Sequence, residues 1–462
     1  MIWRAPQRSS WQTLREEGVG RFKPFSTAPV PERAILVGVD LGNSEWSCAG
    51  LNVIDLAELA RLAETDGAEV VLTMVQRLDS PVPKTFIGKG KVEELCSYVK
   101  NLDADVVIFD DELTPSQQAN LEKIVGEPVK IIDRTALILD IFGVHAKTHE
   151  GRLQVQLAQL QYVLPRLRGM WSHLVGEQTR GGIGSRFGQG ESQLEVDRRL
   201  VRARISTLRR ELDRLDKRRS VQSKARWDSG VYRVALVGYT NAGKSTLLNR
   251  LTGSDVYVQD ELFATLDPTT RALDLEEGRK ITITDTVGFI QKLPTMLIES
   301  FKSTLAEVRA ADLILLVVDA SDPHRELEIE AVRSVLSEID ASEIRCVTVL
   351  NKCDLLSEEE RREVLLAHPE AQPISALEGQ GIRGLLYRIA KEAAQGSVTM
   401  SVLVPYEKGL LMKMVHERCQ VIRESYVQGG LLATVKADKR MAATLEPYRA
   451  VDEPLGDEPH NG

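Results

Sequence analysis

The segment Gly-Tyr-Thr-Asn-Ala-Gly-Lys-Ser at residues 238–245 constrains the fold more than any other part of the chain. It lies between an apolar, strand-like run and a helix-forming stretch. In such a loop, Gly238 and Gly243 let the backbone curl so that several N–H groups point inward. Lys244 then places a positive charge beside the β- and γ-phosphates, and Ser245 offers a hydroxyl to Mg²⁺. The chain is therefore predicted to bind a nucleoside triphosphate at the edge of an α/β sheet.

The motif Asn-Lys-Cys-Asp at residues 351–354 indicates which base is bound. It follows the apolar run at residues 344–350, which predicts a buried strand ending at the nucleotide edge of a parallel sheet. Guanine presents two adjacent donors, N1–H and the exocyclic amine, that the Asp354 carboxylate can accept, whereas adenine has no matching donor at N1. Asn351 is expected to tie this loop to the phosphate loop, and the stem of Lys352 to lie over the purine face. An isolated motif of this kind would be an ordinary polar turn, but its register with the phosphate loop favours GTP.

A third motif, Asp-Thr-Val-Gly, follows another strand-like stretch and is expected to sense the γ-phosphate. Asp285 can hold Mg²⁺ through a water, and Gly288 can offer its backbone N–H to the γ-phosphate. Upstream, Thr265 is predicted to supply the second hydroxyl to Mg²⁺, with Thr269 and Thr270 as rival candidates. Loss of the γ-phosphate would release both loops and so give an order-to-disorder switch.

The complete set of predicted site residues adds two segments to these motifs. Residues 375–377, after a short apolar stretch, are expected to present backbone N–H groups to the guanine O6 atom. Catalytic roles are assigned to Lys244, Thr265 and Gly288, and Mg²⁺ ligation to Ser245 and Thr265. The predicted nucleotide contacts are Gly238, Tyr239, Thr240, Asn241, Ala242, Gly243, Lys244, Ser245, Phe263, Ala264, Thr265, Leu266, Asp267, Asp285, Thr286, Val287, Gly288, Asn351, Lys352, Cys353, Asp354, Ser375, Ala376 and Leu377.

The residue after Gly288 predicts slow hydrolysis. It is Phe289, at the position where a Ras-like protein has the glutamine that orients the attacking water, and no obvious substitute stands nearby. Intrinsic turnover is therefore expected to be slow and to rise when a partner or a monovalent cation completes the site. Asn241 stands where potassium-activated GTPases place an ion ligand, so K⁺ is a candidate cofactor. Alternatively, Asn241 caps the backbone of its own loop.

Composition and cysteine usage indicate an intracellular protein that does not enter a membrane. No apolar run approaches the ~18 residues needed to span a bilayer. The five cysteines are scattered, odd in number and without a C-x-x-C pair, which argues for reduced thiols and against a disulfide frame or a zinc site. The predicted location is the cytoplasm, with the protein monomeric when free.

A basic helix stands out against the net charge of −8. Between residues 197 and 228 the chain carries twelve arginines and lysines and only three acidic residues. Apolar residues recur at helical spacing in this helix and in residues 151–167, which predicts two antiparallel helices joined by residues 168–193. These apolar positions are Leu194, Val201, Ile205, Leu208, Leu212 and Leu215, with Leu153, Leu157, Leu160 and Leu164 in the partner helix. The outward arginines either contact a nucleic-acid backbone or form a solvated charged face.

The connection between these helices is rich in glycine and arginine. Residues 179–190 hold five glycines, two arginines and Phe187. Such a loop can reach into structured RNA, with the arginines on phosphates or base planes and the aromatic ring available for stacking. It can equally be a bare flexible hinge.

The pattern of apolar segments predicts an α/β multidomain protein. Near the amino terminus, strands are predicted at residues 34–39, 70–75, 106–109 and 129–132, and helices at 56–65, 91–101 and 116–125. Near the carboxyl terminus, strands are predicted at 402–404 and 431–435 with a helix at 406–423 between them. The predicted divisions are a disordered extension (1–30), an N-terminal α/β domain (31–145), a basic helical hairpin with a Gly-rich loop (146–228), a P-loop GTPase domain with a parallel-rich sheet and helices on both faces (229–396), a small C-terminal α+β domain (397–450) and a polar tail (451–462).

Four further segments carry a resemblance to a known family. They read Phe-Ile-Gly-Lys-Gly-Lys-Val-Glu-Glu-Leu at 86–95, Asp-Arg-Thr-Ala-Leu-Ile-Leu-Asp-Ile-Phe at 133–142, Thr-His-Glu-Gly-Arg-Leu-Gln-Val-Gln-Leu-Ala-Gln-Leu at 148–160 and Phe-Ala-Thr-Leu-Asp-Pro at 263–268. With the motifs above, they resemble the HflX-type ribosome-associated GTPases of the Obg-HflX group over residues 70–377. The resemblance implies GTP hydrolysis, binding to the large ribosomal subunit through its RNA, and splitting or rescue of stalled ribosomes under stress. It also supports Thr265 as the Mg²⁺ ligand and makes a hydrophobic residue usual at Phe289.

The glycine-rich loop departs from the family's pattern. Ser185, Phe187, Gln189 and Ser192 replace the usual Thr, Gly, Pro and Thr, a difference that concerns the ribosome-contacting tip and not GTP binding. Two other functions fit the motifs. One is a ribosome-biogenesis factor that uses GTP as an RNA-binding switch. The other is a signalling GTPase acting on protein partners, against which the basic hairpin argues.

Overall fold

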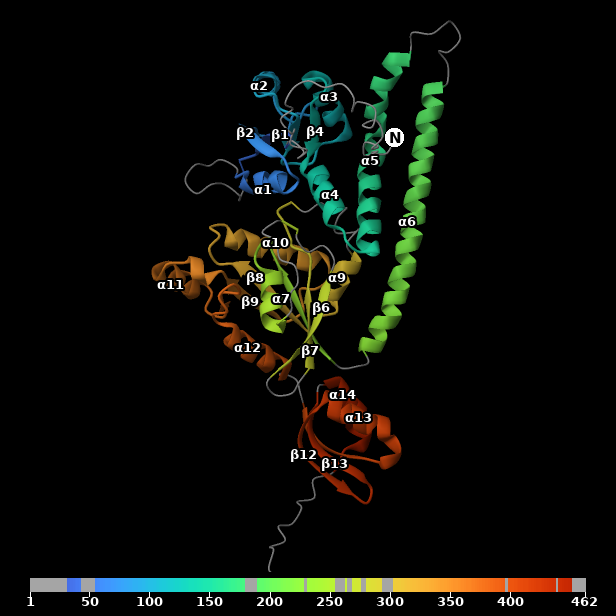
Figure 1. The fold of residues 1–462 in the computed structure, drawn as a ribbon, viewed down its shortest axis with the longest axis vertical. Helices are drawn as coiled ribbons and strands as arrows, with labels where there is room; N and C mark the ends of the chain where they lie inside the picture. The colour runs from blue at the N-terminus through green and yellow to red at the C-terminus, as the bar shows by residue number, and fades with distance from the viewer. Residues whose placement is uncertain are drawn as a thin grey trace, which may run out of the picture.

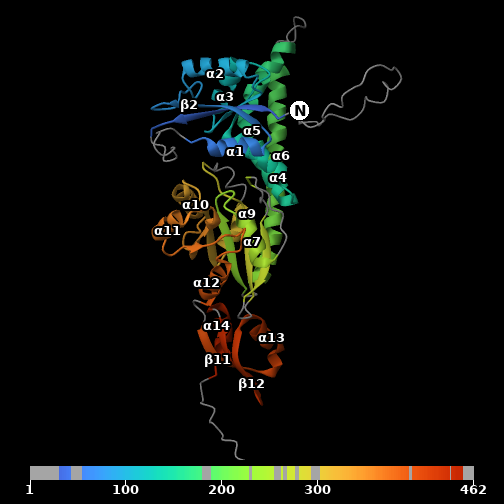
Figure 2. The ribbon, with the colours of Figure 1, turned by 60° about the vertical axis from the view of Figure 1, so that its left-hand side comes forward.

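The computed structural model describes residues 31–42, 55–178, 189–227, 231–253, 262–263, 268–275, 280–292, 302–394, 398–437 and 439–450. The predicted extension at 1–30 and the predicted tail at 451–462 lie outside these ranges. Figures 1 and 2 show an N-terminal part, a central part and a small C-terminal part arranged along the long axis, with a long helical hairpin beside the first two.

The N-terminal part is a four-stranded parallel sheet in the order β2-β1-β3-β4. Its strands are β1 (Arg33–Asp40), β2 (Glu69–Arg77), β3 (Val106–Phe109) and β4 (Lys130–Asp133), and its helices are α1 (Ala57–Thr65), α2 (Lys89–Asn101), α3 (Pro115–Val125) and α4 (Arg134–His145). The four predicted strands and three predicted helices are confirmed. Helix α4 was not predicted, because most of its residues are buried and the segment shows no amphipathic period.

The helical hairpin consists of α5 (His149–Gln178) and α6 (Gln189–Trp227). Its seam contains Leu153, Leu157, Ile205 and Leu208, flanked by Leu160, Leu164, Val201, Leu212 and Leu215, as the spacing predicts. The side chain of Leu194 is not described. The predicted connection at 168–193 is too long, because α5 continues through Pro165 to Gln178 and α6 begins at Gln189. Residues 179–188 of the glycine-rich loop lie outside the described ranges.

The central part is a six-stranded sheet in the order β10-β9-β8-β5-β7-β6, in which only the edge strand β6 is antiparallel. Its strands are β5 (Tyr232–Gly238), β6 (Thr269–Asp274), β7 (Lys280–Asp285), β8 (Leu313–Asp319), β9 (Cys346–Asn351) and β10 (Gln372–Pro373). Its helices are α7 (Lys244–Thr252), α9 (Lys302–Arg309), α10 (Arg325–Glu338), α11 (Glu358–Ala367) and α12 (Ile382–Ala394). Leu305, Val332 and Val364 of α9, α10 and α11 pack on one face of the sheet, and Leu247 and Leu385 of α7 and α12 pack on the other.

The register of this sheet brings the predicted motifs to one edge. In parallel pairing, Leu236 lies opposite Asp285, Gly238 opposite Val317, and Asp319 opposite Asn351. The strands β5, β7, β8 and β9 therefore end together, and the loops that follow them form one rim. In an open α/β sheet this carboxyl edge is where ligands bind.

The C-terminal part is a three-stranded antiparallel sheet in the order β11-β13-β12. It comprises β11 (Val398–Val404), α13 (Gly409–Arg418), β12 (Gln420–Val427), β13 (Gly430–Ala437) and α14 (Lys439–Leu445). The predicted helix at 406–423 is wrong at its end, because the helix stops at Arg418 and β12 follows it. Strand β12 lies at the sheet edge with nearly all of its described side chains exposed, so its sequence lacks the alternation that marks a half-buried strand. Among the helices of the described ranges, none is long and apolar enough to cross a membrane.

Candidate functional site

The predicted phosphate loop connects the end of β5 to the start of α7. A Cβ on Gly238 would lie 2.1 Å from the Val317 carbonyl oxygen, so no side chain fits at this position. Gly243 has φ of +89°, and a Cβ there would lie 2.3 Å from Asn351 Nδ2. Glycine is therefore required at both ends of the loop. At Gly238 the reason is the close approach of a neighbouring backbone, and at Gly243 it is both a close contact and the left-handed backbone conformation.

The side chain of Lys244 is folded back under this loop. Its Nζ atom donates hydrogen bonds to the carbonyl oxygens of Gly238 and Tyr239, at 3.1 and 2.7 Å. Burial lowers the pKa of this ammonium to about 8, although the nearby Asp285 carboxylate acts in the opposite direction. An anion at this position would favour the charged form.

Ser245 and Asp285 place two oxygen atoms that could bind a cation beside the phosphate loop. The Ser245 hydroxyl donates to Asp285 Oδ2 at 2.7 Å, and Asp285 is fully buried at the end of β7. A hydroxyl and a carboxylate oxygen suit Mg²⁺, which prefers oxygen ligands. Thr265 lies outside the described residues, as do Ala264, Leu266 and Asp267. Of its rivals, Thr270 places its Oγ1 atom 2.9 Å from Thr284 Oγ1 within the β6–β7 pair, and Thr269 begins β6.

The predicted γ-phosphate loop lies directly against the phosphate loop. A Cβ on Gly288 would lie 2.8 Å from Thr240 Cγ2 and 3.1 Å from Lys244 Nζ. The backbones are joined by two hydrogen bonds, from Thr240 N to Phe289 O at 2.8 Å and from Phe289 N to Gly238 O at 3.1 Å. The structure therefore places Gly288 beside the lysine of the phosphate loop.

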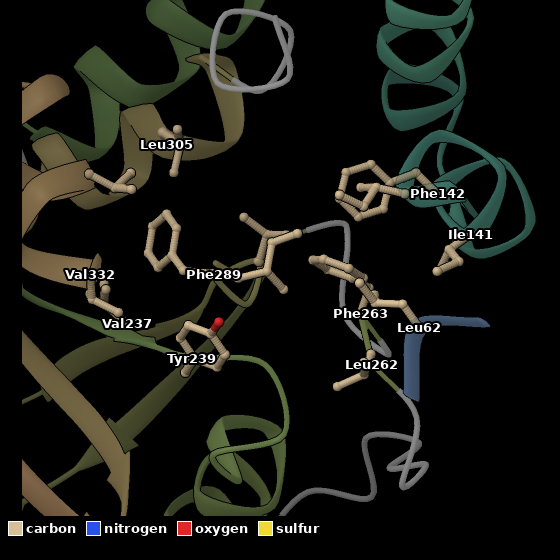
Figure 3. Close-up of a cluster of buried hydrophobic side chains, with 14 of the residues drawn as sticks. Leu62, Ile141, Phe142, Val237, Tyr239, Leu262, Phe263, Phe289, Leu305 and Val332 are labelled. Carbon is tan, nitrogen blue, oxygen red and sulfur yellow. The ribbon is translucent and has the colours of Figure 1, made fainter. Parts of the chain in front are cut away.

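Phe289 contributes to the core and not to the rim. Its side chain is 1% exposed and points toward Val237, Leu305 and Val332 (Figure 3). An apolar, buried ring at this position cannot hydrogen-bond a water. The structure thus gives the physical reason why hydrolysis is expected to be slow.

Asn351 ties the predicted base-recognition loops to the phosphate loop. Its Nδ2 atom donates to the Ala242 carbonyl at 2.8 Å, and its Oδ1 atom accepts from the Ala376 N–H at 2.9 Å. The motif's carboxylate, on Asp354, has a buried Oδ1 atom without a hydrogen-bond partner among the described residues. These contacts bring the three loops into one site.

Two features of the base-recognition loops were missed from sequence. Arg250, on α7, donates from Nε to the Ala376 carbonyl at 3.0 Å and from Nη2 to the Leu377 carbonyl, so it holds the segment expected to reach the guanine O6 atom. Lys352 pairs its Nζ atom with Asp319 Oδ2 at 2.7 Å, which fixes the direction of its stem. Neither contact has a local sequence signal, because the partners are far apart in the chain.

A buried carboxyl group lies close enough to Tyr239 and Lys244 of the phosphate loop to act on them electrostatically. Glu328 on α10 is 7% exposed, and its Oε2 atom has no hydrogen-bond partner in the described part of the chain. Burial raises its pKa to about 8, and the neighbouring Asp322, Asp319 and Glu58 add to this rise while Arg61 opposes it. Burial therefore favours the neutral, protonated form of Glu328.

Comparison with known proteins identifies the chain. Three family models match in succession: "GTP-binding GTPase N-terminal" at residues 54–143, "GTP-binding GTPase Middle Region" at 145–226 and "50S ribosome-binding GTPase" at 233–352. The GTPase HflX of Magnetococcus marinus is 43% identical over 86% of this chain and 90% of its own length. The GTPase HflX of Caldanaerobacter subterraneus is 46% identical over 88% of this chain and 91% of its own length.

The fold and the rim of loops define the class of protein as a P-loop GTPase, with an N-terminal α/β domain, a helical hairpin and a small C-terminal domain attached. The relatives match over most of both chains. This chain belongs to the HflX family of GTPases, and its reaction is the hydrolysis of GTP. A solved GTP-binding protein from Sulfolobus solfataricus, in complex with GDP, is 24% identical with a TM-score of 0.41 over 79% of this chain and 99% of that chain, a likeness too low to add to the assignment.

Glu328→Gln is expected to change how stability depends on pH. The folded-state pKa of about 8 lies above the ordinary value of 4.5, so between these values the folded chain holds a proton that the unfolded chain has released. The free energy of unfolding of the wild type should therefore fall as pH rises through this window, and the substitution should remove up to about 1.4 kcal/mol per pH unit of that slope. Melting temperatures at pH 6 and pH 8.5 measure the effect.

The matched control is Glu330→Gln, an exposed position on the same helix. If both variants follow the wild-type pH profile, Glu328 does not hold the proton.

Proposed function

We propose that GTP binds across the carboxyl edge of the central sheet, with its phosphates on residues 238–245 and its base between the loops at 351–354 and 375–377. The observation that carries this proposal is the buried Asp354 Oδ1 atom, which has no partner among the described residues. A buried carboxylate oxygen costs free energy unless it is paired. The two adjacent donors of guanine would pair it, and adenine offers no matching donor at N1.

The proposed catalytic residues act on the γ-phosphate. The Lys244 charge and the Gly288 N–H would stabilise the charge that the phosphoryl oxygens carry in the transition state. Ser245 and Asp285, with Thr265, would hold Mg²⁺, which supplies further positive charge when bound. Because the ring of Phe289 is directed into the core, intrinsic turnover would be slow until a partner or a cation completes the site.

Asp354→Ala is expected to weaken GTP binding by roughly 10- to 100-fold, because a charge-assisted hydrogen bond contributes about 1.5–3 kcal/mol. Weak binding of ATP should be unchanged, since adenine does not use this carboxylate. Calorimetry with the two nucleotides in the presence of Mg²⁺ measures both effects. Glu363→Ala, an exposed carboxylate on α11, is the matched control. Equal or tighter binding of ATP by the wild type would overturn the guanine preference.

Potassium is expected to raise the rate of GTP hydrolysis above its value in sodium. A cation held by Asn241 would lie where negative charge develops on the phosphates. The measurement is kcat in potassium and sodium chloride at equal ionic strength, for the wild type and for Asn241→Ala, which should lose the difference. Equal wild-type rates in the two salts would contradict a cation site at Asn241. The asparagine would then be explained by its backbone φ of +58° alone, a conformation that asparagine tolerates better than most residues.

The large ribosomal subunit is the proposed partner, and the helical hairpin is the proposed surface that contacts its RNA. Among the described side chains of helix α6, the following basic residues are exposed: Arg199, Arg202, Arg204, Arg209, Arg210, Arg214 and Lys217. Basic groups on a long, rigid helix can neutralise successive backbone phosphates. The family model matched by the central domain is described as a 50S ribosome-binding GTPase, which supports this partner.

On this basis the protein would act in the cytoplasm, as a monomer when free, to split or rescue stalled ribosomes under stress. The alternative is a biogenesis factor that uses GTP as an RNA-binding switch. Incubation of the purified protein and GTP with vacant ribosomes distinguishes the two. A splitting factor would convert intact ribosomes into subunits in a sucrose gradient, whereas a biogenesis factor would leave them intact.

The double substitution Arg202→Ala and Arg209→Ala is expected to weaken association with large subunits and to flatten its salt dependence. Each lost phosphate contact lowers the slope of log affinity against log salt by about one, so the slope should fall by about two. Co-sedimentation at several salt concentrations, with a non-hydrolysable GTP analogue, measures the slope. Lys391→Ala, an exposed lysine on α12, is the matched control. An unchanged slope would contradict the assignment of this face to RNA.

A further inference from the structure

The hydroxyl of Tyr239 links the nucleotide site to the N-terminal domain. Tyr239 belongs to the phosphate loop and is buried, and its hydroxyl donates to Glu58 Oε1 on α1 at 2.9 Å. The same hydroxyl accepts a hydrogen bond from the backbone N–H of Gln291 at 2.5 Å, and that N–H also lies 3.3 Å from Glu58 Oε1. Gln291 is three residues after Gly288. One carboxylate of the N-terminal domain therefore holds both the phosphate loop and the segment that follows Gly288.

The N-terminal domain fixes Glu58 from behind. Arg134, at the start of α4, is 2% exposed and places Nη2 2.7 Å from Glu58 Oε2. Its Nη1 atom pairs with Asp110 Oδ1 at 2.5 Å. A buried guanidinium between two carboxylates compensates their charge and fixes their positions. The acceptor offered to Tyr239 is thus preorganised within one domain.

A second charged contact holds the same segment. Lys292 directs Nζ to Asp110 Oδ2 at 2.7 Å and to Asp111 Oδ1 at 2.5 Å, both at the carboxyl end of β3. Lys292 has a backbone φ of +51°. Residues other than glycine seldom adopt this left-handed conformation, and the surrounding contacts hold it in place here. Gln291 and Lys292 are therefore bound to the N-terminal domain by neighbouring carboxylates that share Arg134.

The N-terminal domain also contacts the segment that precedes Thr265. The ring of Phe142 on α4 meets the ring of Phe263 edge-to-face, with centroids 4.6 Å apart and an interplanar angle of 82°. Figure 3 shows Leu62 and Ile141 beside Leu262 and Phe263, across the boundary between the two domains. One domain thus touches both segments that flank the γ-phosphate position.

We propose that Glu58 of the N-terminal domain is a positioning residue for GTP hydrolysis. Through the Tyr239 hydroxyl it fixes the backbone that follows Gly288, and so the N–H that would meet the γ-phosphate. This inference rests on the proposed roles of Gly288 and Lys244. GDP would use the phosphate loop, which Glu58 also holds through Tyr239, but not the Gly288 N–H. Loss of the Glu58 contact should therefore weaken the binding of nucleotides that carry a γ-phosphate more than the binding of GDP.

Tyr239→Phe removes the linking hydroxyl and keeps the ring in the core. The hydroxyl makes two hydrogen bonds, each with a net contribution of about 1 kcal/mol. Its loss is expected to lower the affinity for a non-hydrolysable GTP analogue by at least about fivefold and to lower kcat by at least a similar factor. The affinity for GDP should fall by a clearly smaller factor, because GDP does not use the Gly288 N–H. Calorimetry with the two nucleotides and single-turnover hydrolysis give the three values. Tyr387→Phe, a 74% exposed tyrosine on α12, is the matched control.

Glu58→Gln and the double variant complete the experiment. Glutamine keeps an acceptor for the hydroxyl but loses the ion pair to Arg134. Glu58→Gln should therefore show a smaller loss for the GTP analogue than Tyr239→Phe does, and again a smaller loss for GDP than for the analogue. This variant carries the test if Tyr239→Phe does not fold. Because both residues act through one chain of hydrogen bonds, the double variant should lose less than the two single losses combined.

The outcomes separate this inference from the proposed function. If the GDP and analogue affinities fall by the same factor, or if the two single losses add in full, Glu58 is merely structural and the inference is overturned. If the variants match the wild type in all three values, the inference is likewise overturned while GTP binding stands. If the wild type itself does not prefer guanine nucleotides, the proposed roles of the site residues fail first.

Discussion

The parallel pairing of β5 with β7 and β8 is the constraint on which the site depends. Gly238 passes so close to the Val317 carbonyl that only glycine fits, and this contact sets where the phosphate loop begins. The same register brings Asp285 opposite Leu236, with its carboxylate beside Ser245. Because side chains alternate between the two faces of a strand, a slip of one residue would turn that carboxylate away. Asn351 joins the rim from the end of β9, which pairs with β8.

Residue 289 shows how packing limits the chemistry. The position from which a Ras-like GTPase orients water carries a phenylalanine buried against Val237 and Leu305. Its burial stabilises the contact between the central sheet and its covering helices, at the cost of a polar group near the γ-phosphate. The segment after Phe289 is in turn held by carboxylates of the N-terminal domain. The segment that follows Gly288 is therefore anchored to the N-terminal domain, but position 289 offers no polar side chain to orient a water.

Acidic and basic side chains are concentrated in different parts of the molecule. The chain has a net charge of −8, which disfavours indiscriminate attraction to nucleic acid. Acidic groups such as Glu58 and Asp110 face inward at the domain boundary, where Arg134 and Lys292 compensate them. The basic residues of α6 face outward instead. A local concentration of basic side chains on an acidic protein is what the proposed contact with an RNA backbone requires.

The sequence by itself determined the parts of this protein whose physical signals are local. Glycine-rich loops, strands with apolar runs, the leucine seam of the hairpin and the Asn-Lys-x-Asp motif each depend on residues close together in the chain, and the order of motifs sufficed to predict the fold of the central domain. Local signals failed for α4, which is buried on most sides, and for β12, which is exposed on most sides, because neither shows a period. Tertiary structure alone decided that Arg250 holds the loop at 376–377 and that Glu58 meets Tyr239, 181 residues away. Such pairs depend on how domains pack, and no spacing along the chain records that.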